Sequence, residues 1–420
     1  MSPRVEAAVH RTFASARSSR NFRLYLLGQV VSATGTWMHF TTSSWLVLQL
    51  SGSGTAIGVN AALAFGPLLL LGPWGGVIAD RFDKRKILIT TQACYGVLAL
   101  LLFSLVVTDI ATLPIVYALS LSTGLVTAFD NPARQSFYVE MVGEEALTNA
   151  VSLNSAAFTG ARIVGPAVAG ILISTVGLAW PFLIDGLSYL AVIGALVAMR
   201  TSELHAQRRS TRERGHLLAG FRYVWSNLDL RRPLIVLAIV FTFSFQFMVL
   251  VPLLAERTFD GDAGTFGWLS AVAGLGSFVG AMTMAHRNAR PSYLALGVLT
   301  TAFGLGLLLL GASPSLPFAL AVMVPMGFVS MAFMINGNTM LQVHAKPEAR
   351  GRVMAIYGAV FLGSTPIGSP VIGWFAEHVG VRQGFALTGG IAVLTGLAVL
   401  WARRRAIEAA PSVEPAATAA

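Results

Sequence analysis

The sequence predicts an all-α membrane protein in which twelve transmembrane helices form two six-helix halves. Of its 420 residues, 55% are hydrophobic and only 11% are charged, whereas a soluble domain has about 25% charged residues. Apolar segments long enough to cross about 30 Å of hydrocarbon recur along the whole chain. A single cysteine excludes a disulfide framework and a cysteine-based metal site. We therefore expect a bundle of helices in a lipid bilayer.

Each predicted helix is a predominantly apolar run of about 20 to 27 residues. The spans of the N-terminal half (23–199) are expected at 23–49, 55–79, 87–107, 112–137, 147–174 and 179–199, and those of the C-terminal half (233–402) at 233–255, 264–285, 292–311, 315–341, 352–376 and 382–402. Residues 200–232 contain eight arginines and are predicted to be a linker between the halves. Residues 1–22 and 403–420 are predicted to be tails.

The basic residues predict the orientation of the chain, because cytoplasmic loops retain Lys and Arg. With the N-terminus inside, 26 of the 29 Lys and Arg residues fall in inner segments. Both termini and the linker are therefore expected in the cytoplasm, and the protein in the cell membrane. The same distribution argues against a nucleic-acid partner, because the charges spread over one face and form no contiguous groove.

A dense cluster of charge, GVIADRFDKRK at 76–86, separates two predicted helices that carry no charged side chain. Such a cluster cannot stay in hydrocarbon, so the chain must reach the membrane surface there and turn back. The second half has a degraded copy, GAMTMAHR at 280–287, which lacks the acidic residue. One intact and one degraded copy fit a duplicated architecture, with the two halves related by an axis along the membrane normal.

This Gly-x-x-x-Asp-Arg loop between the second and third helices resembles the signature loop of the major facilitator superfamily, with Asp83 where that loop usually has glycine. Other phrases resemble a narrower group, the transmembrane secretion effectors, which include enterobactin exporters. These phrases are NFRLYLLGQ (21–29), GTW (35–37), FDNPARQ (129–135), NAVSLN (149–154), GFRY (220–223) and RGRVM (350–354). The resemblance implies the major facilitator fold.

The resemblance also implies that the charged loop acts as a cytoplasmic latch between the halves. The carboxylate of Asp80 would accept hydrogen bonds at the open N-terminus of the eleventh helix, near Gly351, where unpaired amides and the helix dipole favour an anion. Arg81 and Arg85 would pair with Asp130. The alternative is that these charges only fix the topology. The latch set comprises Gly76, Asp80, Arg81, Arg85, Asp130 and Arg134.

Asp130 and Arg134 are four residues apart, so they share a helix face and are expected to bridge each other. Pro132 lies between them and is expected to kink or end the helix. We interpret the two charged residues as a gate element rather than as a substrate contact.

The fifth helix contains Gly160, Gly165, Pro166 and Gly170, which resemble the glycine and proline motif of antiporting exporters. Small residues let a neighbouring helix approach closely, and Pro166 is expected to kink the span. Packing is the simple interpretation, and a functional role would also act through packing.

His39, Arg162 and Asp185 lie within predicted spans, where ionisable side chains usually face a cavity or a partner. We predict that Arg162 and Asp185 form a buried ion pair. His39, whose side chain has an ordinary pKa near 6.5, is a candidate proton or substrate site, with a structural hydrogen-bonded histidine as the alternative.

The seventh and tenth helices offer candidate cavity residues. Large apolar side chains share one face of the seventh helix and would form an adaptable wall, although such side chains also face lipid or a neighbouring helix. The candidates are Phe241, Phe245, Gln246, Met248, Asn336 and Asn338.

These features predict a secondary active transporter, specifically a proton-driven exporter of small organic molecules such as drugs or siderophore-like metabolites. Its expected partners are a substrate, protons and membrane lipid, and it is expected to be a monomer without cofactor or metal. No phosphate-binding loop or catalytic cluster is present in the sequence, so we do not expect an enzyme. The alternatives are a nutrient importer of the same fold, which would be expected to carry more acids and amides in its cavity, and a non-transporting membrane scaffold.

Overall fold

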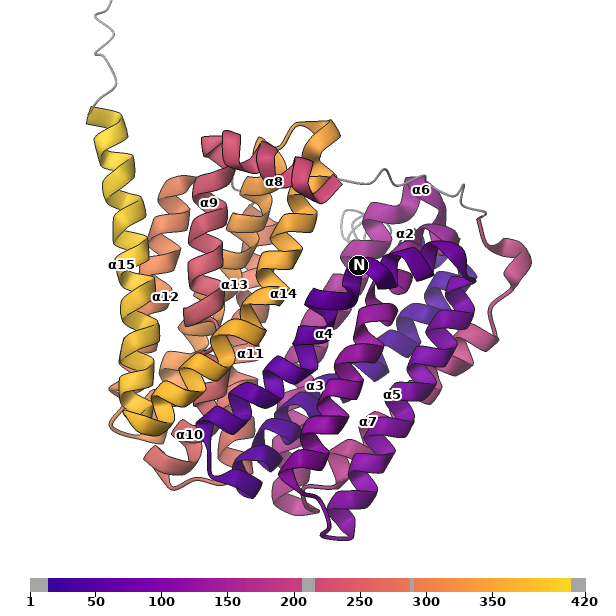
Figure 1. Ribbon diagram of the computed structural model, residues 1–420, viewed down its shortest axis with the longest axis horizontal. Helices are drawn as coiled ribbons and strands as arrows, with labels where there is room; N and C mark the ends of the chain where they lie inside the picture. Colours follow the sequence, from indigo (N-terminus) through magenta and orange to yellow (C-terminus); the bar gives the residue numbers. More distant parts are fainter. Residues whose placement is uncertain (1–13, 206–215, 288–290, 409–420) are drawn as a thin grey trace, which may run out of the picture.

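The computed structural model describes residues 14–205, 216–287 and 291–408, and these ranges form helices without any β-strand. The helices are arranged as two bundles that stand side by side, one from each half of the chain (Figure 1). The predicted all-α architecture of two halves is therefore confirmed.

The first bundle contains one helix of unusual length. Its elements are α2 (Ala14–Ser18), α3 (Arg20–Ser51), α4 (Gly54–Arg81), α5 (Lys84–Val107), α6 (Leu113–Thr175), α7 (Trp180–Val197) and the short η1 (Thr201–Glu203). The 63 residues of α6 would be about 95 Å long if straight, about three times the thickness of the hydrocarbon. Gly143, with φ 74° and ψ 174°, interrupts it. The helix continues through Pro132 and turns back at this glycine, so 113–142 and 144–175 are two spans.

The second bundle begins with a short helix and a broken span. Its elements are α8 (His216–Ser226), α9 (Leu228–Ile239), the π-helical η2 (Val240–Ser244), α10 (Phe247–Phe259), α11 (Ala263–Arg287), α12 (Tyr293–Gly311), α13 (Leu316–His344), α14 (Pro347–His378) and α15 (Val381–Glu408). The elements α9, η2 and α10 follow one another as a single span. This span begins at Leu228 because the Asn227 side chain caps it, accepting a 3.0 Å hydrogen bond from the Asp229 amide.

Among the described residues, ten helical stretches have the length and apolar composition of a membrane span. That count takes α6 as one stretch and omits α3, whose 32 residues are long enough but include many polar side chains. With α6 divided at Gly143 and α3 added, the twelve predicted spans are present.

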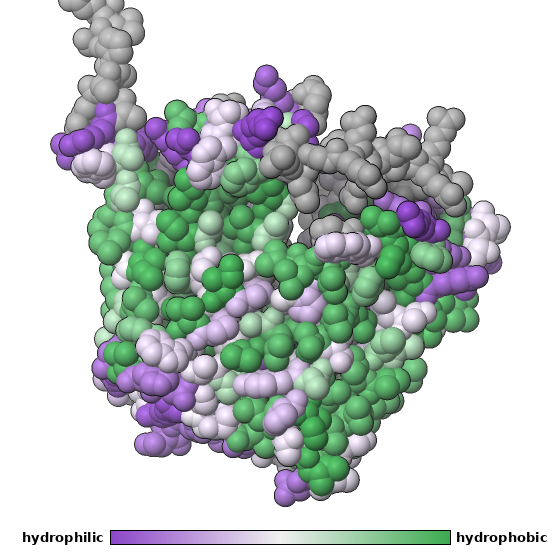
Figure 2. Space-filling view, in the orientation of Figure 1, coloured by the Kyte–Doolittle hydropathy of each residue, from purple (hydrophilic) through white to green (hydrophobic). Residues whose placement is uncertain are grey.

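The helix ends define two faces. The face that carries the start of α3, the α4–α5 turn, η1, α8 and the end of α15 is called the basic face here, because Arg20, Lys84, Arg200, Arg222 and Arg405 lie on it. The other is called the opposite face. Figure 2 shows a broad hydrophobic band between hydrophilic side chains at the two faces, as expected for a protein that spans a bilayer.

The two bundles touch chiefly near the opposite face. There α4 packs on α14, and the second part of α6 packs on α11. A Cβ added at Gly54 would lie 2.8 Å from the Gly373 carbonyl oxygen, and one at Gly170 would lie 2.8 Å from the Gly267 Cα. Backbones can approach this closely only where small residues face each other. Glycines therefore form the seal at this face.

Towards the basic face the same helices separate. A Cβ added at Gly351 or Gly358, in the part of α14 near the basic face, would meet nothing within 4 Å in the described part of the chain, whereas one at Gly363, further along α14, would lie 2.9 Å from the Leu69 Cδ1 of α4. The side chains of Asp80 and Arg81, at the end of α4, are exposed. The contacts between α4 and α14 are thus made from the opposite face to the middle of the two helices, and none of these contacts is seen at the basic-face ends of the two helices in the described residues.

This packing predicts the effect of adding one methyl group. Gly373→Ala would place a Cβ against the carbonyl oxygen of Gly54, and the strain or the loss of the seal should cost about 1–3 kcal/mol. We expect a lower thermal unfolding temperature in detergent. Gly66→Ala, on α4 but in open space, is the matched control and should leave the temperature unchanged. Equal temperatures for both variants would contradict the packing of α4 on α14.

Candidate functional site

A cavity of about 750 Å³ lies against the first bundle and extends to α13 of the second. Its walls come from α3, α4, α5, both parts of α6 and α7, while Met331 and Met334 of α13 complete the lining. Hydroxyl and amide side chains are frequent in it. Gln29, Ser32, Thr36, His39 and Ser43 of α3 line it at steps of three or four residues, which is the spacing of one helix face. A cavity of this size and mixed polarity suits a small organic ligand.

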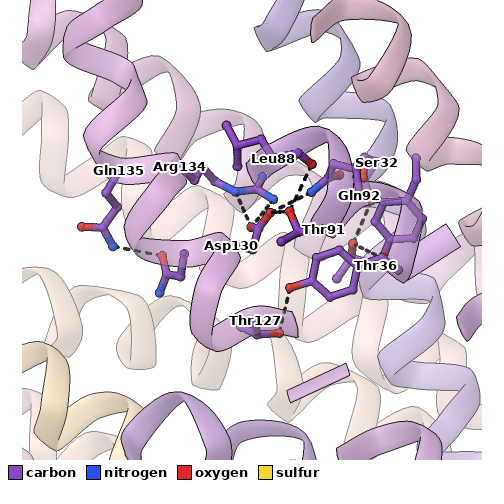
Figure 3. A network of polar contacts seen from close by, with 12 residues as sticks. Ser32, Thr36, Leu88, Thr91, Gln92, Thr127, Asp130, Arg134 and Gln135 are labelled. Carbon is purple, nitrogen blue, oxygen red and sulfur yellow. Dashed lines mark hydrogen bonds and ion pairs between the residues drawn. The ribbon is translucent and has the colours of Figure 1, made fainter. Parts of the chain in front are cut away.

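One buried ion pair in the cavity wall is fully compensated within the first bundle (Figure 3). The Oδ2 of Asp130 accepts hydrogen bonds from Nε and Nη2 of Arg134, at 2.9 and 2.6 Å. Its Oδ1 accepts from Oγ1 of Thr91 at 2.7 Å and from Nε2 of Gln92 at 3.0 Å. The structure thus places Asp130 and Arg134 in the bridge expected from their spacing, and gives the carboxylate two further donors from α5.

The expected pairing of Asp130 with Arg81 and Arg85 is absent from the described residues. Nε of Arg85 donates to the Leu196 carbonyl at 2.7 Å, and its Nη2 donates to the Val197 carbonyl at 3.1 Å. These are free carbonyls at the end of α7, where the helix dipole also favours a cation. Arg85 is held there, and the oxygens of Asp130 are already occupied.

The latch predicted for Asp80 is not engaged in this conformation. No hydrogen bond joins Asp80 to the described residues of α14, because α4 and α14 are apart at the basic face. Gly76, one turn earlier in α4, is buried. The role of the latch stays a prediction for the conformation in which the basic face is closed.

A second buried carboxylate pairs with histidine. The Nδ1 of His39 lies 3.0 Å from the Oδ2 of Asp185, whose side chain is 1% exposed against 19% for His39. The Tyr189 hydroxyl is 3.5 Å from the same oxygen. The histidine ring is not aligned for a linear hydrogen bond, and the Oδ1 of Asp185 has no partner among the described residues. Both residues line the cavity.

The predicted ion pair between Arg162 and Asp185 is therefore not formed. Asp185 faces α3 from α7, whereas the guanidinium of Arg162 lies 5.4 Å from the centre of the Trp37 ring, in a cation–π contact. Trp37 and His39 are two residues apart in α3 and so point about 200° apart around it. Arg162 and Asp185 thus find partners on different sides of the same helix.

The glycine and proline residues of the second part of α6 lie in two helix contacts. A Cβ at Gly165 would lie 2.9 Å from the Thr34 carbonyl oxygen of α3, and one at Gly267 of α11 would lie 3.2 Å from the Pro166 carbonyl oxygen. Gly170 faces Gly267 across the two bundles, while Gly160 meets nothing within 4 Å. The segment therefore packs against its own bundle and against the other one.

The candidates from the seventh and tenth helices do not line this cavity. Phe241 is fully buried, and its ring centre lies 5.0 Å from that of Phe361 and 5.1 Å from that of Phe245. Gln246 accepts a 2.6 Å hydrogen bond from Ser369 of α14. The aromatic rings thus pack against one another in the core of the second bundle.

The remaining three candidates also have structural surroundings. Met248 packs against the same apolar core, Asn336 is bonded to the backbone of Ser292, and Asn338 accepts from Gln342. The polar cavity lies instead in the first half. The row of polar residues at helical spacing in α3 is the pattern in the sequence that indicates this cavity.

The Asp130 network predicts a large loss of stability on truncation. Asp130→Ala would leave the guanidinium of Arg134 buried without its partner, which typically costs about 3–5 kcal/mol. We expect a clearly lower unfolding temperature, partly restored in Asp130→Ala/Arg134→Ala. Glu145→Ala, an exposed acid on α6, is the control for charge alone. No recovery in the double variant would contradict the pairing.

Comparison with known proteins agrees with this architecture. The chain matches the sequence profile of the transmembrane secretion effector family over residues 11–418. It is 26% identical to the multidrug efflux pump Tap of Mycolicibacterium fortuitum, over 92% of this chain and 97% of that protein. It is 23% identical to the staphyloferrin A transporter of Staphylococcus aureus, over 84% of this chain and 89% of that protein. It is 24% identical to the enterobactin exporter EntS of Shigella boydii, over 84% of each.

Solved transporters share the fold at low identity. A bacterial homologue of the human lysosomal transporter Spinster superposes with a TM-score of 0.71 at 15% identity, over 95% of this chain and 99% of that one. The nucleoside transporter NupG superposes with a TM-score of 0.72 at 12% identity, over 91% of this chain and 98% of that one. The chain therefore belongs to the transmembrane secretion effector family and is a multi-pass transporter of the major facilitator superfamily, not an enzyme.

Proposed function

We propose that the protein is a proton-driven exporter of small organic molecules that works by alternating access. The observation that carries this proposal is the His39–Asp185 pair, which lies in the wall of the cavity, while the two bundles pack closely together at the opposite face. The basic face is the cytoplasmic one, because 26 of 29 Lys and Arg residues are predicted there. A substrate then enters from the cytoplasm and leaves on the opposite side.

The His39–Asp185 pair has the properties of a proton carrier. With one proton shared between them the two side chains have no net charge, and without it they carry one negative charge. Asp185 is almost fully buried, and one of its oxygens has no hydrogen-bond donor among the residues that the structure describes. An uncompensated carboxylate is costly in a membrane interior, so the protonated pair favours closure of the bundles around it. His39 is the accessible member and connects Asp185 to the cavity.

The Asp130–Arg134 pair has a different role in this proposal. Its charges are balanced, and Asp130 accepts four hydrogen bonds within the first bundle. Such a network fixes the positions of α5 and α6 relative to each other. It keeps the cavity wall rigid while the two bundles move.

The substrate is a small organic compound of drug-like or siderophore-like size. A cavity of about 750 Å³ is within the range of about 300–1,000 Å³ that holds such ligands. Rings such as Phe40 and Phe65, stacked at 5.5 Å, offer apolar contact beside the hydroxyl and amide groups. The names of the relatives, an efflux pump and two siderophore transporters, support compounds of this kind.

Accumulation measurements test the function. Cells with and without the protein are exposed to a panel of fluorescent lipophilic compounds and a siderophore, before and after a protonophore. We expect lower accumulation of at least one compound in cells that contain the protein, and loss of the difference with the protonophore. Higher accumulation would indicate an importer and contradict the proposal. A difference that survives the protonophore would contradict proton coupling.

A histidine variant tests the proton carrier. His39→Gln removes the imidazole that would share a proton with Asp185, so transport should lose its dependence on pH. Asp185→Asn should abolish coupled transport. His286→Gln, an exposed histidine at the end of α11, is the matched control. If the transport rate of His39→Gln still depends on pH as it does in the unchanged protein, this residue does not couple transport to protons.

A further inference from the structure

The end of α14 at the opposite face carries a carboxylate that reaches into the first half of the chain. We propose that Glu377 is a positioning residue of the transport cycle, whose carboxylate caps the N-terminus of α4 and holds the opposite face shut. This inference rests on the alternating access proposed above. It adds an outer counterpart to the latch that the sequence predicts at the basic face.

Three donors at the start of α4 converge on a single oxygen of Glu377. Oγ of Ser53 donates to Oε2 at 2.6 Å, and the backbone amide of Thr55 donates to the same oxygen at 3.0 Å. The Thr55 hydroxyl makes a third, short hydrogen bond to it. Glu377 is half-buried, so these bonds are shielded from water on one side. One carboxylate thus ties the last turn of α14 to the first turn of α4.

The position of these donors makes the contact favourable for an anion. Ser53 is the N-cap of α4, and its own oxygen accepts from the Ala56 amide. Thr55 lies in the first turn, where backbone amides have no partner within the helix and the dipole is positive. A carboxylate that accepts from such an amide makes a charge-assisted hydrogen bond, which is stronger than a neutral one.

The surrounding contacts show why the bond can form only when the opposite face is closed. One turn before Glu377, the backbone of Gly373 touches that of Gly54. Arg257 of α10 also donates to the carbonyl oxygen of Gly52, across the two halves. Any movement that separates α4 from α14 here breaks the three bonds to Glu377.

The geometry also relates Glu377 to Asp80. The helices α4 and α14 run in opposite directions, so the N-terminus of each is at the same face of the molecule as the end of the other. Asp80 is in the last turn of α4 and Glu377 in the last turn of α14. Each carboxylate can therefore cap the partner helix, one at each face. In this structure the Glu377 cap is made and the Asp80 cap is not, as expected if the two alternate.

Cysteine labelling from outside the cell tests the inference. The natural Cys94, which is exposed, is replaced by alanine, and Ala64 in the cavity wall is replaced by cysteine. A membrane-impermeant maleimide then reaches position 64 only when the opposite face opens. We expect Glu377→Gln to raise the labelling rate about tenfold, the effect of weakening charged hydrogen bonds. Thr55→Val, which removes one donor and keeps the shape, should raise it less.

Two further variants separate this inference from simpler explanations. Glu256→Gln makes the same charge change on α10, where the structure shows no hydrogen bond of that side chain within the described residues, and should leave the rate unchanged. Asp80→Asn should lower the labelling rate at position 64. The rate of the double variant Glu377→Gln/Asp80→Asn should lie between the rates of the two single variants.

The outcomes are distinct. Asp80→Asn could change the labelling rate while Glu377→Gln and Thr55→Val leave it unchanged. That result would overturn the role of Glu377 and leave alternating access intact. Equal responses to Glu256→Gln and Glu377→Gln would reduce the effect to surface charge and also overturn it. Position 64 unlabelled in every variant would contradict alternating access, and the inference would fail with it.

Discussion

Hydrocarbon cannot solvate a charge, and the arrangement of this protein follows from that constraint. Three buried charged side chains of the first bundle have local partners: Asp130 has Arg134 and two α5 side chains, Asp185 has His39, and Arg162 has the ring of Trp37. An unpaired charge would cost several kcal/mol in such surroundings. These pairs connect neighbouring helices, so the polar groups that make the cavity also hold its walls.

The two halves contribute unequally to the cavity and to the buried charged groups. The first bundle supplies nearly all of the cavity lining and both buried carboxylates, whereas the second contributes two methionines and a core of aromatic rings around Phe241. A duplicated chain needs only one half to keep a costly set of ionisable groups. The degraded loop at 280–287 fits this division.

The spans could be predicted because hydrophobic length and basic flanks are local properties of the sequence. The pairings of side chains between helices could not be predicted, because they depend on how each helix is rotated about its axis. Asp185 was expected to pair with Arg162, but α7 turns its side chain towards α3. Gly35 leaves room for it there, since a Cβ at Gly35 would lie 2.8 Å from the Asp185 Oδ1. Likewise, Arg85 prefers the free carbonyls of α7 over a carboxylate already occupied. The Asp130–Arg134 bridge was predictable because both residues are on one helix.

Proton-coupled export is tested most directly with purified protein in liposomes that enclose a pH-sensitive dye. A compound identified by the accumulation screen is added to one side while the internal pH is followed. Coupled export predicts that movement of the compound inwards drives protons outwards, and that the proton movement stops in the Asp185→Asn variant. Movement of the compound with no change in internal pH would contradict the role of the His39–Asp185 pair and the antiport that depends on it.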